Sequence, residues 1–212
     1  MKTTLEALGL KPMIIYESII STLKPDKTPH AAPIGFTLLD DQTIRLRPYK
    51  KTITYKNLKR NMQGVINIVS DAYLFFETTF PKHASEKSYS FEPAVKILTP
   101  RLAGADAYIE FEVSSIKEIN ELCEVYCLPV NTVVGCLRPR AITRAETALL
   151  EATIHTTRIK VFVKMGDIQK AKELLQRILY YKALVDRVAP ESRYASALDK
   201  LVKYSEELLN RY

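Results

Sequence analysis

The hydrophobic pattern of this chain of 212 residues changes its period near residue 140. Before that point, apolar residues alternate with polar ones or form short β-branched runs, as they do in strands. After Pro139 they recur at spacings of three and four residues, as on the buried face of a helix. We therefore predict a mainly β domain over residues 1–139 and a helical extension over residues 140–212.

In the first part, several short strand signals follow one another, separated by turn residues. We expect strands at residues 13–23, 30–39, 43–47, 64–69, 73–80, 108–113 and 124–134. A short helix is expected at residues 52–61, and residues 81–102, with three prolines, are expected to form an irregular excursion. Short strands with one helix indicate a closed or half-closed antiparallel barrel.

In the second part, three amphipathic helices follow one another with short turns between them. Gly166 and Asp167 separate the first from the second, and Asp167 is a suitable N-cap. The segment Pro190-Glu191-Ser192 separates the second from the third. Three such helices predict a small bundle that either packs on the barrel or forms a partner surface.

Membrane and metal-site signals are weak in this sequence. No N-terminal segment has the order of a signal peptide, and no apolar run approaches the roughly 20 residues of a membrane span. We therefore expect a soluble cytoplasmic protein without a membrane partner. The cysteines are Cys123, Cys127 and Cys136, and no His or Cys pair completes the ligand spacing of a zinc site. We expect buried free thiols and no metal.

The positive charge of the chain is partly concentrated in one segment. The formal net charge is +7, and a cluster within 16 positions contains Arg45, Arg47, Lys50, Lys51, Lys56, Lys59 and Arg60. Such a cluster permits nucleic-acid binding, but binders of single strands usually add several exposed aromatic side chains as stacking platforms. Only Tyr49 and Tyr55 are available here, so a nucleic-acid partner is less favoured than a phosphate site.

The order of elements in residues 30–70 favours a phosphorylated cofactor. A strand of small residues, a strand with two arginines and a basic Thr-rich turn lead into the predicted helix, whose N-terminus attracts anions. The residues expected to bind phosphate are Arg47, Lys51, Thr52 and Thr54. The alternative is a solvated basic face beside a capped helix.

Four motifs in this order resemble a known superfamily. They are His30-Ala31-Ala32-Pro33-Ile34-Gly35, Thr54-Tyr55-Lys56-Asn57-Leu58, Val65-Ile66-Asn67, and the series Arg144-Ala145, Glu151-Ala152 and His155-Thr156-Thr157-Arg158. Together they resemble the FMN-binding split barrels, which include flavin reductases and pyridoxine phosphate oxidase. The chain is most similar to the archaeal DUF447 family, in which an antiparallel split β-barrel carries a helical C-terminal extension.

This resemblance implies FMN as the cofactor and a homodimer that builds each flavin site between two subunits. It places Ala32, Pro33, Ile34 and Gly35 beside the flavin ring and Tyr49 over the ribityl chain or ring edge. Asn67, on an apolar strand, needs a polar partner if it is buried, and either the flavin or the Thr54 turn is a candidate. His30 stands where the family favours Asn.

The resemblance further implies an oxidoreductase that passes electrons from NAD(P)H or the deazaflavin F420 through FMN to an unknown acceptor. No set of catalytic side chains is evident, which is compatible with chemistry carried by the cofactor. A non-catalytic flavin carrier or sensor and a basic nucleic-acid-binding barrel are the alternatives. Arg144, Glu151, His155 and Arg158 form one helical stripe that either reaches the cofactor or forms an ion-pair ladder.

Overall fold

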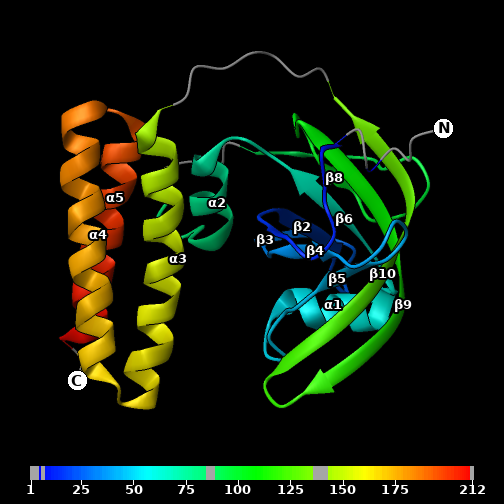
Figure 1. Ribbon diagram of the computed structural model, residues 1–212, viewed down its shortest axis with the longest axis horizontal. Helices are drawn as coiled ribbons and strands as arrows, with labels where there is room; N and C mark the ends of the chain where they lie inside the picture. The colour runs from blue at the N-terminus through cyan, green and yellow to red at the C-terminus, as the bar shows by residue number, and fades with distance from the viewer. Residues whose placement is uncertain (1–4, 6–7, 85–88, 136–142, 211–212) are drawn as a thin grey trace. The chain divides into compact units, whose positions relative to one another are not determined.

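The computed structural model describes residues 5, 8–84, 89–135 and 143–210. The chain divides into two compact units, which we describe separately. Unit 1 consists of Met1–Ser70 and Tyr89–Arg138, and unit 2 consists of Asp71–Ser88 and Pro139–Tyr212. Figure 1 shows the strands of unit 1 and the helices of unit 2.

Unit 1 is built on one curved antiparallel sheet of eight strands (Figure 1). Their order in the sheet is β1-β4-β5-β10-β9-β6-β2-β3. The strands are β1 (Ile15–Tyr16), β2 (Ile19–Leu23), β3 (Pro29–Pro33), β4 (Phe36–Leu38), β5 (Ile44–Leu46), β6 (Gln63–Ile68), β9 (Ala107–Ile119) and β10 (Leu122–Val134). A small second sheet pairs β7 (Phe91–Glu92) with β8 (Arg101–Leu102). The predicted antiparallel split-barrel class with a C-terminal helical extension is confirmed.

The predicted strand over residues 30–39 is divided between two positions in the sheet. Its first half, β3, pairs with β2, whereas β4 pairs with β1 and β5. In β5 the predicted alternation holds, because Ile44 and Leu46 are fully buried while Arg45 lies on the other face.

Helix α1 (Ile53–Asn61) packs against β2, β3 and β6. Its Tyr55 and Leu58 belong to the same core as Ile66, Ile109 and other buried residues of the sheet. A Cβ atom on Gly64 would lie 2.6 Å from Cζ of Phe111 and 3.2 Å from Cδ2 of Leu58. Glycine in β6 therefore permits this close packing of helix and sheet.

The alternation predicted for residues 108–113 is wrong at Glu110, which is fully buried. Its carboxylate accepts hydrogen bonds from the backbone N–H groups of Val95 (2.8 Å) and Lys96 (2.7 Å). It also accepts one from Nδ2 of Asn131 (3.0 Å). The loop after β7 covers this face of β9, and its N–H groups satisfy the buried carboxylate.

Cys123 and Cys127 are buried free thiols, as predicted, and burial raises the pKa of Cys127. Cys136 lies outside the described residues.

The predicted strand over residues 73–80 is wrong, because this segment forms helix α2 (Ala72–Thr79). Asp71 caps the helix by accepting a hydrogen bond from the Tyr73 N–H (2.9 Å). A short apolar run without clear periodicity fits a buried strand or a buried helix equally well, and here the cap and the surrounding helices favour the helix.

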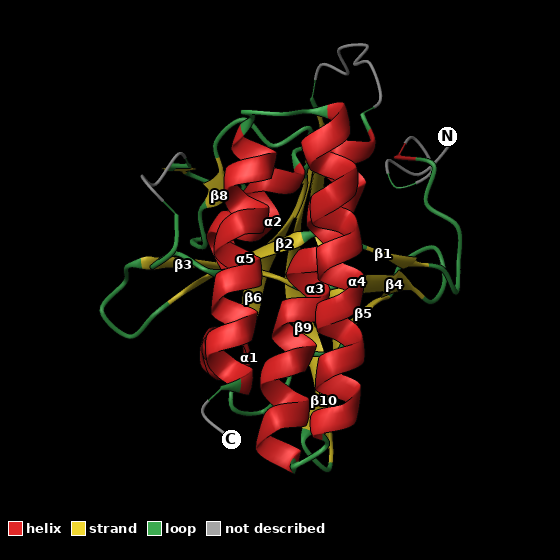
Figure 2. Cartoon of the chain, turned by 90° about the vertical axis from the view of Figure 1, so that its left-hand side faces the viewer, coloured by secondary structure: helices red, strands yellow, loops and turns green. Residues whose placement is uncertain are grey.

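Unit 2 is a helical bundle (Figure 2). In addition to α2 it contains α3 (Arg144–Met165), α4 (Ile168–Val188) and α5 (Arg193–Leu209), so the three predicted C-terminal helices are present. Gly166 ends α3 in the left-handed conformation (φ 78°), and Asp167 caps α4. Ser192 caps α5. Among the described helices, none combines the length and apolar character needed to cross a membrane.

Candidate functional site at the start of helix α1

The first turn of α1 has the features of an anion-binding helix start. Thr52 adopts an extended conformation, and its Oγ1 accepts a hydrogen bond from the Tyr55 N–H (3.2 Å). The same hydroxyl donates to the carbonyl of Tyr49 (2.7 Å). No acidic residue lies in this turn, and the N–H groups of Ile53 and Thr54 precede the helical hydrogen-bond ladder. The positive end of the helix dipole therefore faces outward without a carboxylate of the same turn beside it.

His30 joins this helix start to the small-residue strand. Its Nε2 lies 3.3 Å from Oγ1 of Thr54, a side chain that is only 1% exposed. On β2, Thr22 pairs with His30 and accepts a hydrogen bond from Nδ2 of Asn57 (3.0 Å). Burial, and secondarily the charge of Lys24, lower the pKa of His30 below its ordinary 6.5. The imidazole is thus neutral at pH 7.

The predicted flavin-ring residues lie on and just after β3, at one edge of the eight-stranded sheet. Ala32, Pro33 and Ile34 are half-buried. Both backbone groups of Ile34 are engaged by Ser18, through hydrogen bonds of 3.0 Å and 2.7 Å. A Cβ atom on Gly35 would lie 3.1 Å from Cγ2 of Ile15, so a small residue is needed there. The structure places this strand beside the start of α1.

Arg47 and Lys51, the predicted phosphate-binding cations, face carboxylates near the start of β10. Nε of Arg47 lies 3.8 Å from Glu124, and Nζ of Lys51 lies 3.1 Å from Glu121. The Lys51 side chain is 86% exposed, so this pair is weak. Tyr49 is exposed, and its backbone forms an isolated antiparallel β-bridge with Leu122. Thr54 thus contacts His30, whereas the two cations point toward carboxylates near β10.

The β9–β10 hairpin places three carboxylates against five cations of the basic cluster. Glu118 accepts a hydrogen bond from the Tyr55 hydroxyl and pairs with Lys50 (3.0 Å) and Lys59 (2.9 Å). The Tyr55 hydrogen bond, then those from the two lysines, lower the pKa of Glu118 to about 2. Because these carboxylates offset part of the positive charge, the nucleic-acid alternative loses part of its support. The acidic residues between positions 118 and 124 were the available sequence signal.

Asn67 is fully buried, and its partners lie within unit 1. Its Oδ1 accepts a hydrogen bond from the Leu102 N–H (2.7 Å). Its Nδ2 donates to the Ile19 carbonyl (2.9 Å) and contacts Oγ of Ser21 (3.1 Å). The sheet and β8, rather than the Thr54 turn, thus satisfy this amide.

The four residues of the predicted stripe on α3 differ in burial and do not form the predicted ion-pair ladder among the described residues. Arg144, Glu151 and Arg158 are exposed, and within the described part of the chain no ion pair joins them. His155 is buried, with its ring centroid 5.9 Å from that of Tyr181. Neither ring nitrogen has a hydrogen-bond partner among the described residues, and burial is the main cause that lowers its pKa.

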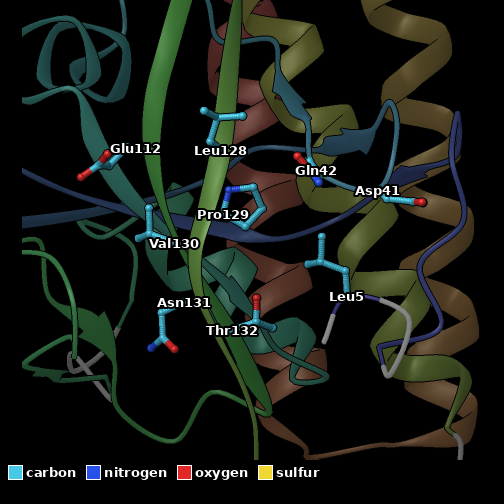
Figure 3. Close-up of a pocket in the computed structure, with 9 residues that line it drawn as sticks. All are labelled: Leu5, Asp41, Gln42, Glu112, Leu128, Pro129, Val130, Asn131 and Thr132. Atoms are coloured by element: carbon cyan, nitrogen blue, oxygen red, sulfur yellow. The ribbon is translucent and has the colours of Figure 1, made fainter. Parts of the chain in front are cut away.

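A cavity of about 530 Å³ lies elsewhere on unit 1, beside β10. Figure 3 shows its lining, in which Leu128 and Pro129 come from β10 and Asp41 and Gln42 from the turn before β5. It contains two carboxylates, those of Asp41 and Glu112, and no Lys, Arg or His. A cavity with this charge repels phosphate, so it does not compete with the start of α1 as an anion site.

The comparisons with known proteins agree with this architecture. Residues 16–135 match the family described as "Protein of unknown function (DUF447) N-terminal domain", and residues 143–203 match "Protein of unknown function (DUF447)". An FMN-bound DUF447 protein from Methanosarcina mazei is similar in structure, with a TM-score of 0.73 and 23% identity. The match covers 94% of this chain and 99% of that one.

A more distant similarity is to nitrilotriacetate monooxygenase component B from Mycobacterium thermoresistibile. There the TM-score is 0.50 and the identity 17%, over 65% of this chain and 78% of that one. Since the two family matches together span most of the described sheet and helices, the chain belongs to the DUF447 family.

Proposed function

We propose that this protein binds FMN at the start of α1 and acts as an oxidoreductase of the flavin-reductase type. The observation that carries the proposal is the contact between His30 and Thr54. It joins a strand of small residues to a helix start without acidic residues, in a fold shared with an FMN-bound family member.

The groups at this helix start fit a phosphate. The N–H groups of Ile53 and Thr54 supply donors, and a dianion is favoured at the helix N-terminus. The ion pair of Lys51 with Glu121 is exposed, and Arg47 lies as far as 3.8 Å from Glu124. Because such contacts are weak, either cation can turn toward the phosphate.

The half-buried strand residues Ala32 and Pro33 have short side chains, which allow a flat ring to approach the backbone, and exposed Tyr49 is available to cover the ribityl chain. Buried Asn67 stabilises this edge of the sheet through its hydrogen bonds to the backbone of β2 and β8. The cavity beside β10 is lined by other residues of unit 1. We therefore assign the closing wall of the site to a second copy of the chain in a homodimer.

Bound FMN would supply hydride and electron transfer, and the protein would supply binding, orientation and access. Reduction of the flavin by NAD(P)H or by reduced F420 fits this role without an acid–base side chain at the site. A flavin carrier or sensor that uses the same residues is the alternative, and it is distinguished by the absence of turnover.

The first experiment is the visible spectrum of the purified protein, with chromatography of the released chromophore. We expect FMN in a 1:1 ratio to the chain, and loss of at least about tenfold in FMN affinity for Thr54→Val/Arg47→Ala. The control Thr147→Val/Arg177→Ala changes two exposed residues of unit 2 and should retain FMN. Unchanged FMN affinity in the first double variant, with wild-type folding, contradicts the assigned site.

Turnover is then measured on the FMN-loaded protein with NADH, NADPH and reduced F420. Reduction of the flavin by one of these donors at a rate above that of free FMN supports an oxidoreductase. Bound FMN that none of the three reduces supports the carrier alternative.

A further inference from the structure

A second cavity, of about 660 Å³, lies at the opposite end of α1 from the candidate phosphate site. We call it the hairpin pocket. Its walls are the β2–β3 turn, the C-terminal end of α1 and the loop that follows β7, and its lining includes Lys24, Lys27, Arg60, Phe91, Leu98 and Pro100. Leu98 is 83% exposed although it is apolar. The pocket thus combines apolar surface with three cations.

The charge of the hairpin pocket is unbalanced. Its lining contains one carboxylate, that of Glu92, and this group pairs with Arg101. Lys24, Lys27 and Arg60 form no ion pair within the part of the chain that the structure describes. Asp26, in the same turn, accepts hydrogen bonds from the N–H (2.9 Å) and hydroxyl (2.6 Å) of Thr28, and the charge of Lys24 adds to the lowering of its pKa. An anion that enters the pocket therefore meets cations without carboxylate partners, in contrast to the paired cations beside β10.

The walls of the hairpin pocket are held in place before any ligand binds. Arg60 donates through Nη2 to the Leu23 carbonyl (2.8 Å), which also accepts from Nδ2 of Asn61 (2.7 Å). On the loop side, the Leu98 N–H donates to Oε1 of Gln63 (2.9 Å). The buried Glu110 carboxylate fixes the same loop through two further N–H groups. A preformed site binds its ligand with less ordering cost than a mobile one.

Helix α1 connects the hairpin pocket to the candidate flavin site. Thr54 and Arg60 are six residues apart, which corresponds to about 9 Å along a helix. Lys24 of the pocket is close enough for its charge to lower the pKa of His30. One extended cofactor is therefore long enough to reach both regions.

We propose that the hairpin pocket binds the phosphate- or carboxylate-bearing end of the reduced redox cofactor that donates electrons to FMN. This inference rests on the proposed function. Two sources supply that chemistry, the 2′-phosphate of NADPH and the anionic tail of F420. The cations select the donor by its charge, and the apolar walls receive its uncharged part.

The test is isothermal titration calorimetry of FMN-loaded protein with NADP⁺, NAD⁺ and oxidised F420, none of which reduces the flavin. We expect NADP⁺ or F420 to bind more tightly than NAD⁺ and more weakly as salt is added. The variant Lys24→Gln/Lys27→Asn should lose about tenfold in affinity for the anionic ligand, the effect of two exposed charge pairs. Asn suits position 27 because φ there is 63°.

The matched control is Lys11→Gln/Lys117→Gln, which removes two exposed lysines of unit 1 outside the hairpin pocket. It should bind the same ligands as the wild type does. FMN content is measured on every preparation from its absorbance. Wild-type protein that retains FMN but binds no anionic ligand, or binds it equally well after the pocket substitutions, overturns the pocket assignment alone. Wild-type protein that binds no FMN contradicts the proposed function.

Discussion

Nε2 of His30 and Oγ1 of Thr54 lie 3.3 Å apart, so a single side-chain contact joins the edge strand β3 to the first turn of α1. The contact lies where a positive helix end, a neutral imidazole and small strand residues meet. Its two partners are 24 positions apart in the chain. The pairing of β2 with β3 brings them together, since it sets His30 opposite Thr22, on which Asn57 of α1 is also anchored.

The titration of His30 gives a first prediction. Because its pKa is lowered from 6.5 in the folded state, the unfolded chain binds the proton more tightly. The stability of FMN-free protein should therefore fall as the pH drops below 6.5. His30→Gln retains a partner for Thr54 but does not titrate, so it should reduce this fall. The measurement is urea unfolding at pH 7 and pH 5.5, and equal losses in the two proteins would refute the prediction.

Glu118 gives a second prediction of the same sign, in a lower pH range. Its folded pKa of about 2 lies below its ordinary 4.5, so its stabilising effect is complete above pH 4.5 and is lost as the pH falls toward 2. Glu118→Gln should flatten this part of the stability profile and release Lys50 and Lys59. Thermal unfolding between pH 5 and 2.5 measures it, with Glu112→Gln as an exposed control on the same strand. A profile as steep as that of the wild type would count against it.

Asn67→Ala should lower the free energy of unfolding by about 2–3 kcal/mol, because it leaves the buried Leu102 N–H without its acceptor. Asn210→Ala, an exposed control, should change it by less than about 0.5 kcal/mol. Urea unfolding of FMN-free protein measures both. A loss of FMN affinity with unchanged stability in Asn67→Ala would instead assign this amide to the cofactor.

His155→Leu should raise the free energy of unfolding by about 1 kcal/mol at pH 7. Neither ring nitrogen of His155 has a partner among the described residues, so an apolar side chain of similar size avoids the cost of burying them. Urea unfolding at pH 7 is again the measurement. Marked destabilisation would reveal a polar partner for this ring, and rescue by His155→Gln would confirm one.

Much of the fold and part of the site were predictable from local patterns. The change of hydrophobic period near residue 140 identified the sheet and the C-terminal helices, since each pattern reports directly which face of an element is buried. The start of α1 was also predictable, because Thr52 caps the helix through a contact only three residues away. The motifs around Pro33 and Thr54 led to the correct family.

What only the tertiary structure decided depends on contacts between residues far apart in the chain. The sequence alone determined that Glu110, Glu118 and Asn67 are polar, but not what surrounds them. Glu110 is buried because the loop at Val95 covers it, and Asn67 because Leu102 reaches it from 35 positions away. Glu118 binds Lys59 across 59 positions, which converts part of an apparent basic patch into ion pairs. Local periodicity contains no information on such pairings, because they are set by the register of strands and the path of loops.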